Sequence, residues 1–173
     1  MINDELWPTA NRTEQYIDSL RGAVPLLSVQ VDVLLRILRD VLPDPQRILD
    51  LGCGDGLLSH ALLHEFPYAE GVLVESSAPV LAAAKRRLAE FEDRLSLVEA
   101  DLQAPNGLAE VPGGAQLAVC GFGVQRLTHA RKQAFFREVY AHLAPGGWFF
   151  ALGLVSAGSG QLNRAHDLFM VDV

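Results

Sequence analysis

Hydrophobic residues along the chain follow two periods, one typical of amphipathic helices and one typical of buried strands. Helical spacing covers residues 13–21 and 26–42, separated by Gly22 and Pro25. Short apolar runs of strand length follow at 48–51, 71–74, 95–98, 116–120 and 148–155. Helical segments separate most of these runs, at 57–66, 79–91 and 130–143. Strands that alternate with helices predict one α/β domain built on a doubly wound, mostly parallel sheet of five strands.

The segment 102–115, between the third and fourth strands, departs from this alternation. It is rich in proline and glycine and is too short for a full crossover helix. One irregular or single-turn helix is expected there.

The first strand ends in a glycine-rich loop. Residues 48–56 read Ile-Leu-Asp-Leu-Gly-Cys-Gly-Asp-Gly, so Asp50 lies in the strand and Gly52, Gly54 and Gly56 follow it. Glycine tolerates positive φ and has no Cβ, which lets the backbone pass close to a ligand. Ligands of doubly wound sheets bind beyond the carboxyl ends of the strands, where this loop and the helix after it are expected to lie.

Two more acidic residues follow strands of the same sheet. Glu75 comes 19 residues after Gly56, a spacing at which a carboxylate accepts hydrogen bonds from both ribose hydroxyls. Asp101 follows the third strand, where a carboxylate is placed to accept from an adenine amino group. The loop and these acids therefore predict a site for an adenosine-containing cofactor.

The spacing of the glycines separates two classes of cofactor. A dinucleotide fingerprint requires G-x-G-x-x-G, whereas this chain has Gly56 one position earlier and Leu57 where the third glycine would stand. The carboxylate of Asp50 also disfavours a pyrophosphate and favours a cationic ligand. A nicotinamide-dependent dehydrogenase is therefore the weaker alternative.

From about residue 16 to residue 155 the chain resembles the class I S-adenosylmethionine-dependent methyltransferases. Their first motif is an acidic residue followed by G-x-G-x-G, as in residues 50–56, and residues 143–147 match the turn before their fifth strand. The resemblance implies that S-adenosyl-L-methionine is the cofactor, with its ribose at Glu75 and its adenine at Asp101 and Leu102. The full set of expected cofactor contacts is Tyr16, Asp50, Gly52, Cys53, Gly54, Glu75, Ser76, Asp101, Leu102 and Cys120.

Residues 118–147 resemble a subgroup of that family which acts on small molecules or modified nucleosides. In the subgroup the fourth strand ends in a segment similar to Ser-Ala-x-x-x-His-His-Leu, and here Gln125 and Arg126 replace the two histidines. Tyr16, Arg21 and Pro25 resemble its amino-terminal lid, so Tyr16 is expected to close over the methionine end of the cofactor.

The resemblance also implies three regions: an amino-terminal helical cap or lid at 1–45, a cofactor-binding core at 46–155, and a carboxyl-terminal helix or tail at 156–173. The family usually continues past the fifth strand with another helix and an antiparallel strand pair, and these strands are expected to be missing or truncated in a chain that ends at Val173. The fifth strand is then an exposed edge. We expect a homodimer, or a longer protein of which this chain is a piece, to cover that edge.

The expected reaction is transfer of a methyl group to a small-molecule acceptor. Because it is an in-line displacement, holding the nucleophile and the methyl group collinear supplies most of the rate acceleration. His129 is a weak candidate for a general base, with the alternative that it only begins a helix after Thr128. Phe122 is a candidate wall of the acceptor site. Since the histidine pair is replaced, a catalytically incompetent cofactor-binding or interaction module is the second hypothesis.

Histidines and cysteines offer further alternatives. His60 and His64 are four residues apart on one expected helix, a spacing that would let both imidazoles bind one metal ion. No third ligand is evident in the sequence, so we prefer the interpretation that the two histidines lie on an exposed helix face. No metal is therefore expected. Cys53 and Cys120 lack CxxC spacing. We expect these two cysteines to serve as small residues beside the cofactor, rather than to form a disulfide or to be reactive thiols.

Composition and charge argue against nucleic-acid-binding and membrane proteins. The 173 residues carry a net charge of −7, and the one basic cluster, Lys85-Arg86-Arg87, is interpreted as a solvated helix face, so binding to a nucleic-acid duplex is not expected. No apolar run approaches the ~18 residues of a membrane span, and no leader precedes Trp7. Together with two isolated cysteines, these features predict a soluble cytoplasmic protein without a membrane partner.

Overall fold

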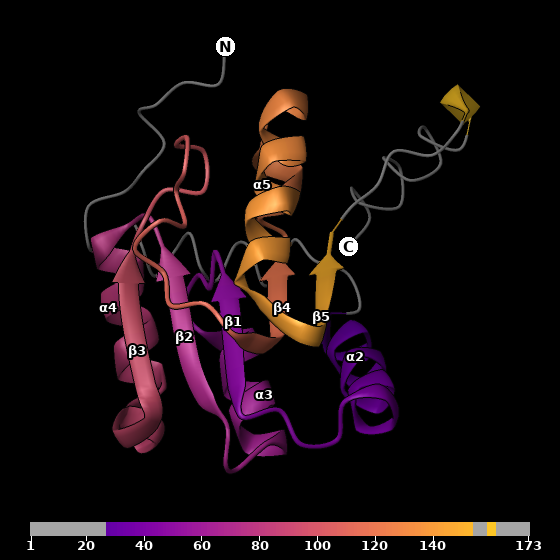
Figure 1. Ribbon diagram of the computed structural model, residues 1–173. Helices are drawn as coiled ribbons and strands as arrows, with labels where there is room; N and C mark the ends of the chain where they lie inside the picture. The colour runs from indigo at the N-terminus through magenta and orange to yellow at the C-terminus, as the bar shows by residue number, and fades with distance from the viewer. Residues whose placement is uncertain (1–26, 154–158, 162–173) are drawn as a thin grey trace.

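Five parallel strands form the centre of the molecule (Figure 1). The computed structural model describes residues 27–153 and 159–161. The strands are β1 (Arg47–Leu51), β2 (Glu70–Glu75), β3 (Leu95–Glu99), β4 (Ala115–Gly121) and β5 (Leu143–Leu152). Their spatial order is β3-β2-β1-β4-β5, and every neighbouring pair is parallel. The predicted doubly wound parallel sheet is therefore confirmed.

Helices cover both faces of the sheet. The helices α2 (Leu27–Val41), α3 (Leu57–Glu65) and α4 (Ala78–Arg87) lie on one face, and α5 (His129–His142) lies on the other (Figure 1). Two 3-10 segments, η2 (Ala89–Arg94) and η3 (Val124–Arg126), follow α4 and β4. Because the strand order reverses at β1, the switch point of the sheet lies between β1 and β4.

Side chains of the central strands alternate between the two faces. In β1, Leu49 and Leu51 pack on the side of α5, whereas Ile48 packs with α2 and α3. In β4, Ala118 lies on the α5 side and Leu117 on the opposite side. All of these side chains are buried. Since both faces are covered, the central strands are mostly apolar, which is the pattern of buried parallel strands, and the buried Asp50 of β1 is an exception to it.

Some element boundaries differ from the sequence prediction. Residues 102–111 form consecutive turns and bends instead of a helix, and residues 112–114 are irregular. The helix expected to reach residue 91 stops at Arg87, and the chain continues as the tighter η2. β5 starts at Leu143, because this residue already pairs with Ala115 before the Pro-Gly-Gly turn shifts the register of the pairing with β4.

β5 lies at one edge of the sheet and, within the described residues, pairs only with β4. Its Trp148 is exposed, as are Phe136 and Tyr140 of α5.

Several expectations concern residues outside the described ranges. These are the helix at 13–21, the lid residues Tyr16, Arg21 and Pro25, and the tail beyond Gln161. Among the helices that are described, none has the length and apolar character needed to cross a bilayer.

Candidate functional site

The glycine loop is fixed to the carboxyl end of β2 through its backbone. The amides of Gly52 and Cys53 both donate to the carbonyl oxygen of Val74, at 2.8 and 3.0 Å. Gly52, Gly54 and Gly56 have φ values of 75°, 57° and 79°. This left-handed region costs residues with a Cβ about 1–2 kcal/mol each, so the loop conformation explains the three glycines.

Gly54 and Gly56 have different surroundings. A Cβ added at Gly54 would have no heavy atom of the described residues within 4 Å, so this residue faces open space among them. A Cβ added at Gly56 would lie 2.8 Å from Cδ1 of Leu88 and 3.4 Å from Cβ of Ala84. Gly56 therefore lets α3 begin close to α4, whereas Gly54 leaves room for a ligand beside the loop.

Asp50 is a buried carboxylate near the carboxyl end of β1, 1% exposed. The hydroxyl of Ser59, on α3, donates a 2.6 Å hydrogen bond to its Oδ2, while its Oδ1 has no hydrogen-bond partner among the described residues. Burial raises the pKa of Asp50 to about 7, opposed by the Ser59 hydrogen bond and assisted by the charge of Glu75. Asp50 therefore titrates near neutral pH and offers one oxygen to a donor.

Glu75 is the last residue of β2, and its carboxylate lies against the glycine loop. Its Oε2 accepts the amide of Gly54 at 3.2 Å, and its Oε1 accepts the amides of Ser76 and Ser77 at 2.9 and 3.1 Å. The hydroxyl of Ser76 also donates to Oε1, at 3.2 Å. These bonds fix the carboxylate beside Gly54, as expected for an acid that serves the same ligand as the loop.

Asp101 and Leu102 follow β3 and belong to the same edge of the sheet. Leu102 is buried, and its Cδ1 lies 3.5 Å from the position that a Cβ on Gly52 would take. Asp101 is exposed, and its Oδ1 accepts the amide of Gln103 at 2.8 Å. Leu102 therefore packs beside the loop, while Asp101 stands at the surface.

Arg131, on α5, holds this segment in place and was missed in the sequence. Its Nε donates to the carbonyl oxygen of Leu102 at 2.7 Å, and its two terminal nitrogens lie 2.6 and 2.7 Å from the two carboxylate oxygens of Glu138. Arg131 is one of the few buried charged residues described. No local pattern links it to Leu102, because 29 positions separate the two.

Arg87 corrects the interpretation of the basic cluster as a wholly solvated face. Its Nη2 and Nε lie 2.7 and 3.0 Å from Oδ2 of Asp55, and its Nε also donates to the carbonyl oxygen of Asp55 at 3.0 Å. Lys85 and Arg86 are exposed, as predicted. Because Asp55 lies inside the glycine loop, Arg87 ties the end of α4 to that loop.

Cys53 and Cys120 are both buried free thiols. Cys53 packs with residues of α3 and α4, whereas Cys120, at the end of β4, packs on the α5 side of the sheet. Burial raises the pKa of Cys120 to about 12 and also raises that of Cys53 well above its usual value. This arrangement favours small packing residues over a disulfide or a reactive thiol.

The segment after β4 carries the two residues considered for acceptor chemistry. Phe122 has a φ of 60°, which is strained for a bulky side chain, and its amide donates to the carbonyl oxygen of Leu152 at 2.8 Å. His129 is exposed at the start of α5, where the Thr128 hydroxyl accepts the amide of Arg131 as a helix cap. A role for His129 as a base stays a prediction.

Most of the expected cofactor contacts meet at the carboxyl edge of the sheet. Asp50, Gly54 and Glu75 lie on the first two strands and their loop, and Cys120 is the residue before the last of β4, the other neighbour of β1. Tyr16 lies outside the described residues.

Comparison with known proteins identifies the same region. A family model for a methyltransferase domain matches residues 48–147. The demethylmenaquinone methyltransferase of Thermus thermophilus is 36% identical over 126 residues, which are 72% of this chain and 54% of that protein. The ribosomal RNA small subunit methyltransferase C of Pasteurella multocida is 29% identical over 125 residues, 70% of this chain and 36% of that protein. The chain thus spans less than two thirds of either relative.

Solved structures agree with the observed sheet. A sugar N-methyltransferase from a Streptoalloteichus species matches with a TM-score of 0.68 and 22% identity, covering 92% of this chain and 59% of that chain. At this identity the likeness supports the fold alone. The family model matches more than half of the chain and includes the glycine loop, Glu75 and Asp101. The chain therefore belongs to the methyltransferase domain family, as the sequence resemblance predicted.

Proposed function

We propose that this chain binds S-adenosyl-L-methionine at the carboxyl edge of its sheet and transfers the methyl group to a small-molecule acceptor. The observation that carries this proposal is the arrangement of Asp50, Gly54 and Glu75. Among the described residues, Gly54 faces open space, Glu75 is fixed beside it, and Oδ1 of Asp50 is a buried acceptor without a partner.

These residues fit a cationic adenosine cofactor. Its sulfonium and ammonium groups are positive, and the carboxylates of Asp50 and Glu75 favour positive charge at the loop. An unpaired buried acceptor costs about 1–3 kcal/mol, which a donor supplied by the ligand would recover. Glu75 would hold the ribose, Asp101 and Leu102 the adenine, and the glycine loop the methionine portion. When bound, the cofactor supplies an electrophilic methyl group.

The contribution of the chain to the reaction is positioning. The nucleophile of the acceptor must be collinear with the transferred methyl group. The side chains that line the acceptor site would therefore affect the rate, because they orient the nucleophile. We place Phe122 in such a wall, because its strained backbone lies directly after β4. His129 is the candidate that would remove a proton from an oxygen or nitrogen acceptor.

A small molecule is the acceptor class that the charge of the chain favours. The names of the relatives cover both demethylmenaquinone and ribosomal RNA as acceptors. RNA binding relies on basic residues that neutralise phosphates, and this chain has a net charge of −7. Turnover assays with small phenolic and quinone-like acceptors, compared with an RNA transcript, test this choice.

The division of the chain and its assembly are also proposals. Residues 46–155 would form the cofactor-binding core, with a cap or lid at 1–45 and a tail at 156–173. Because α2 packs against the sheet, the part of the cap that closes over the cofactor would be the segment before it, with Tyr16. A homodimer would cover β5, and light scattering measures it directly.

Calorimetry with S-adenosylhomocysteine tests the cofactor site. Asp50→Ala and Glu75→Ala should each weaken binding at least about tenfold, since a hydrogen bond to a charged group is worth about 1.5–3 kcal/mol. Glu70→Ala is the matched control, because Glu70 begins the strand that Glu75 ends and is exposed. Absence of binding by the wild type, or unchanged affinity in both site variants, would refute the proposal.

A cofactor-binding module without catalysis is the second candidate. The observation behind it is that Gln125 and Arg126, in η3, stand where the related subgroup has two histidines. Tight binding of S-adenosylhomocysteine without methyl transfer to any acceptor of a broad panel would favour this function over the enzyme. The nicotinamide-dependent dehydrogenase receives no support from the family match.

A further inference from the structure

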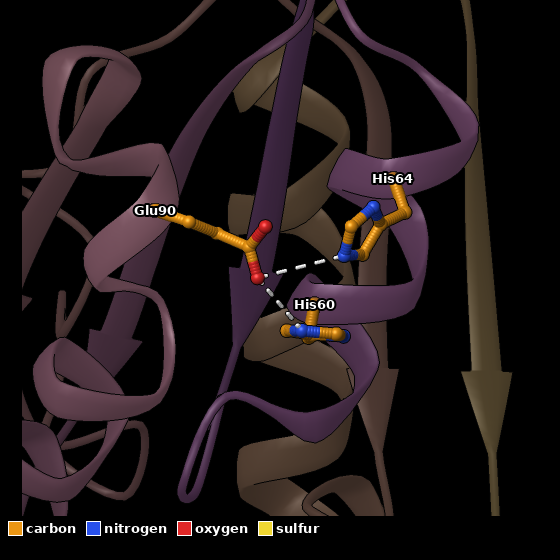
Figure 2. A group of neighbouring side chains, drawn as sticks. All are labelled: His60, His64 and Glu90. Carbon is orange, nitrogen blue, oxygen red and sulfur yellow. Dashed lines mark ion pairs between the residues drawn. The ribbon is translucent and has the colours of Figure 1, made fainter.

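Two histidines of α3 and one glutamate of η2 converge outside the proposed cofactor site (Figure 2). Oε1 of Glu90 lies 3.3 Å from Nε2 of His60 and 3.6 Å from Nε2 of His64. One ligand atom from each side chain lies within 4.8 Å of the others. Nothing in the sequence connects Glu90 to the histidine pair; the packing of η2 against α3 does.

We propose that His60, His64 and Glu90 form a binding site for a divalent transition metal of the zinc type. With zinc–nitrogen distances of about 2.0–2.1 Å, ligand atoms of a tetrahedral site lie roughly 3.3–3.4 Å apart. The separations of Oε1 of Glu90 from the two imidazole nitrogens, 3.3 and 3.6 Å, are close to this value, and all three ligand atoms lie within 4.8 Å of one another. Two imidazoles and one carboxylate select zinc, cobalt or nickel over magnesium and calcium, which prefer oxygen ligands.

The scaffold restricts the three ligands before any metal arrives. The His60 and His64 rings lie edge to face at a centroid distance of 4.6 Å, and both contact the ring of Phe91, at 5.7 and 4.9 Å. Phe91 is buried and directly follows Glu90 in η2. The same residue therefore anchors η2 and orients both imidazoles, which lowers the entropy cost of coordination.

Solvent reaches the cluster, so a metal can enter and water can complete its coordination. The side chains of His60, His64 and Glu90 are 37%, 54% and 53% exposed. The carboxylate compensates part of the charge of the metal. Without a metal, the same contacts are ordinary polar contacts between the Glu90 carboxylate and the two imidazoles, and this is the alternative that the experiment must separate.

A metal at this position would join two elements that are not consecutive in the chain. α3 begins directly after the glycine loop, and η2 follows α4, whose Arg87 already binds Asp55 in the same loop. The metal would therefore be a second link between the elements that follow the glycine loop, in addition to the Arg87–Asp55 contact, and would stabilise the folded state. The three ligands are distinct from Asp50, Glu75 and Asp101, so the inference does not depend on the proposed methyl transfer.

Zinc titration by calorimetry tests the site, with protein freed of any purification tag and at about pH 7.5, where imidazoles are available as ligands. We expect one zinc ion to bind per chain. His60→Gln/His64→Gln and Glu90→Gln should each weaken binding at least about tenfold, because even the loss of an outer partner of a metal ligand costs 10–100-fold. Glu92→Gln, an exposed neighbour in η2, is the matched control and should bind as the wild type does.

Two independent readouts complete the test. Cobalt(II) should give the visible absorption bands of a tetrahedral nitrogen and oxygen site in the wild type and in Glu92→Gln, but not in Glu90→Gln. Zinc should raise the melting temperature of the same two proteins, because it binds the folded state. Failure of the wild type to bind zinc, or equal zinc affinity in Glu90→Gln and Glu92→Gln, would overturn the proposal and leave the ordinary polar contacts.

Discussion

The hydroxyl of Ser59 donates a 2.6 Å hydrogen bond to Oδ2 of Asp50, joining the first turn of α3 to the strand before the glycine loop. The bond engages one oxygen of a buried carboxylate and leaves the other, Oδ1, without a partner among the described residues. It thereby determines which oxygen of Asp50 is offered to a ligand.

Asp50 should make stability depend on pH near neutrality. Burial raises its pKa from 3.8 to about 7, so between these values the folded state binds more protons than the unfolded state. Its contribution to the free energy of unfolding is therefore greatest at low pH and is lost as pH rises through 7. Asparagine cannot titrate, so the free energy of unfolding of Asp50→Asn should not fall in this way. Its difference from the wild-type value should therefore rise by about 1–3 kcal/mol from about pH 5 to about pH 8. Urea unfolding at both pH values measures this, and a constant difference between the two proteins would contradict it.

The ion pair between Arg87 and Asp55 should stabilise the glycine loop. Arg87→Gln removes the guanidinium that binds both the side chain and the carbonyl oxygen of Asp55. Because the pair is partly exposed, we expect a loss of only about 1 kcal/mol of stability, together with roughly three- to tenfold weaker binding of S-adenosylhomocysteine. Arg86→Gln, one position earlier and exposed, is the control. Equal affinities in the two variants would show that the pair does not order the loop.

Gly54→Ala and Gly56→Ala should show that Gly54 leaves room for a ligand, whereas Gly56 allows close packing of two helices. Both residues have positive φ, so each alanine costs about 1–2 kcal/mol of backbone strain. At Gly56 the new Cβ also meets Leu88 at 2.8 Å, whereas at Gly54 no atom of the described part of the chain lies within 4 Å of it. We expect Gly56→Ala to lower the melting temperature more, and Gly54→Ala to weaken S-adenosylhomocysteine more. Thermal unfolding and calorimetry on both variants check the order, and the reverse order would contradict it.

Phe122→Gly should relieve backbone strain and tests whether Phe122 lines the acceptor site, as proposed. Glycine adopts the φ of 60° found at this position without the cost of about 1 kcal/mol or more that phenylalanine pays. We expect stability to change by less than about 1 kcal/mol, because relief of strain offsets the lost apolar contact. Binding of S-adenosylhomocysteine should stay within about twofold, while the KM for the methyl acceptor rises. An unchanged KM for the methyl acceptor would show that Phe122 does not line the acceptor site.

The sequence alone determined the sheet and the main parts of the candidate site. Apolar runs of strand length, separated by helical segments, predicted the five parallel strands, and glycine spacing predicted a loop with positive φ. Asp50, Glu75 and Asp101 were predicted because they lie near the carboxyl ends of strands or just after them, and the carboxyl ends of parallel strands meet at one edge of the sheet. These features are local in the chain, so a local pattern records them.

Only the tertiary structure decided which side chains far apart in the chain meet, both at that site and outside it. Arg87 reaches Asp55 across 32 positions, Arg131 reaches Leu102 across 29, and Glu90 approaches His60 and His64 because η2 packs against α3. The pKa of Asp50 likewise depends on burial by neighbours that its own segment does not contain. Hydrophobic periodicity shows which face of an element is buried. It does not show which polar atoms another element places beside that face, because this depends on how the elements pack together.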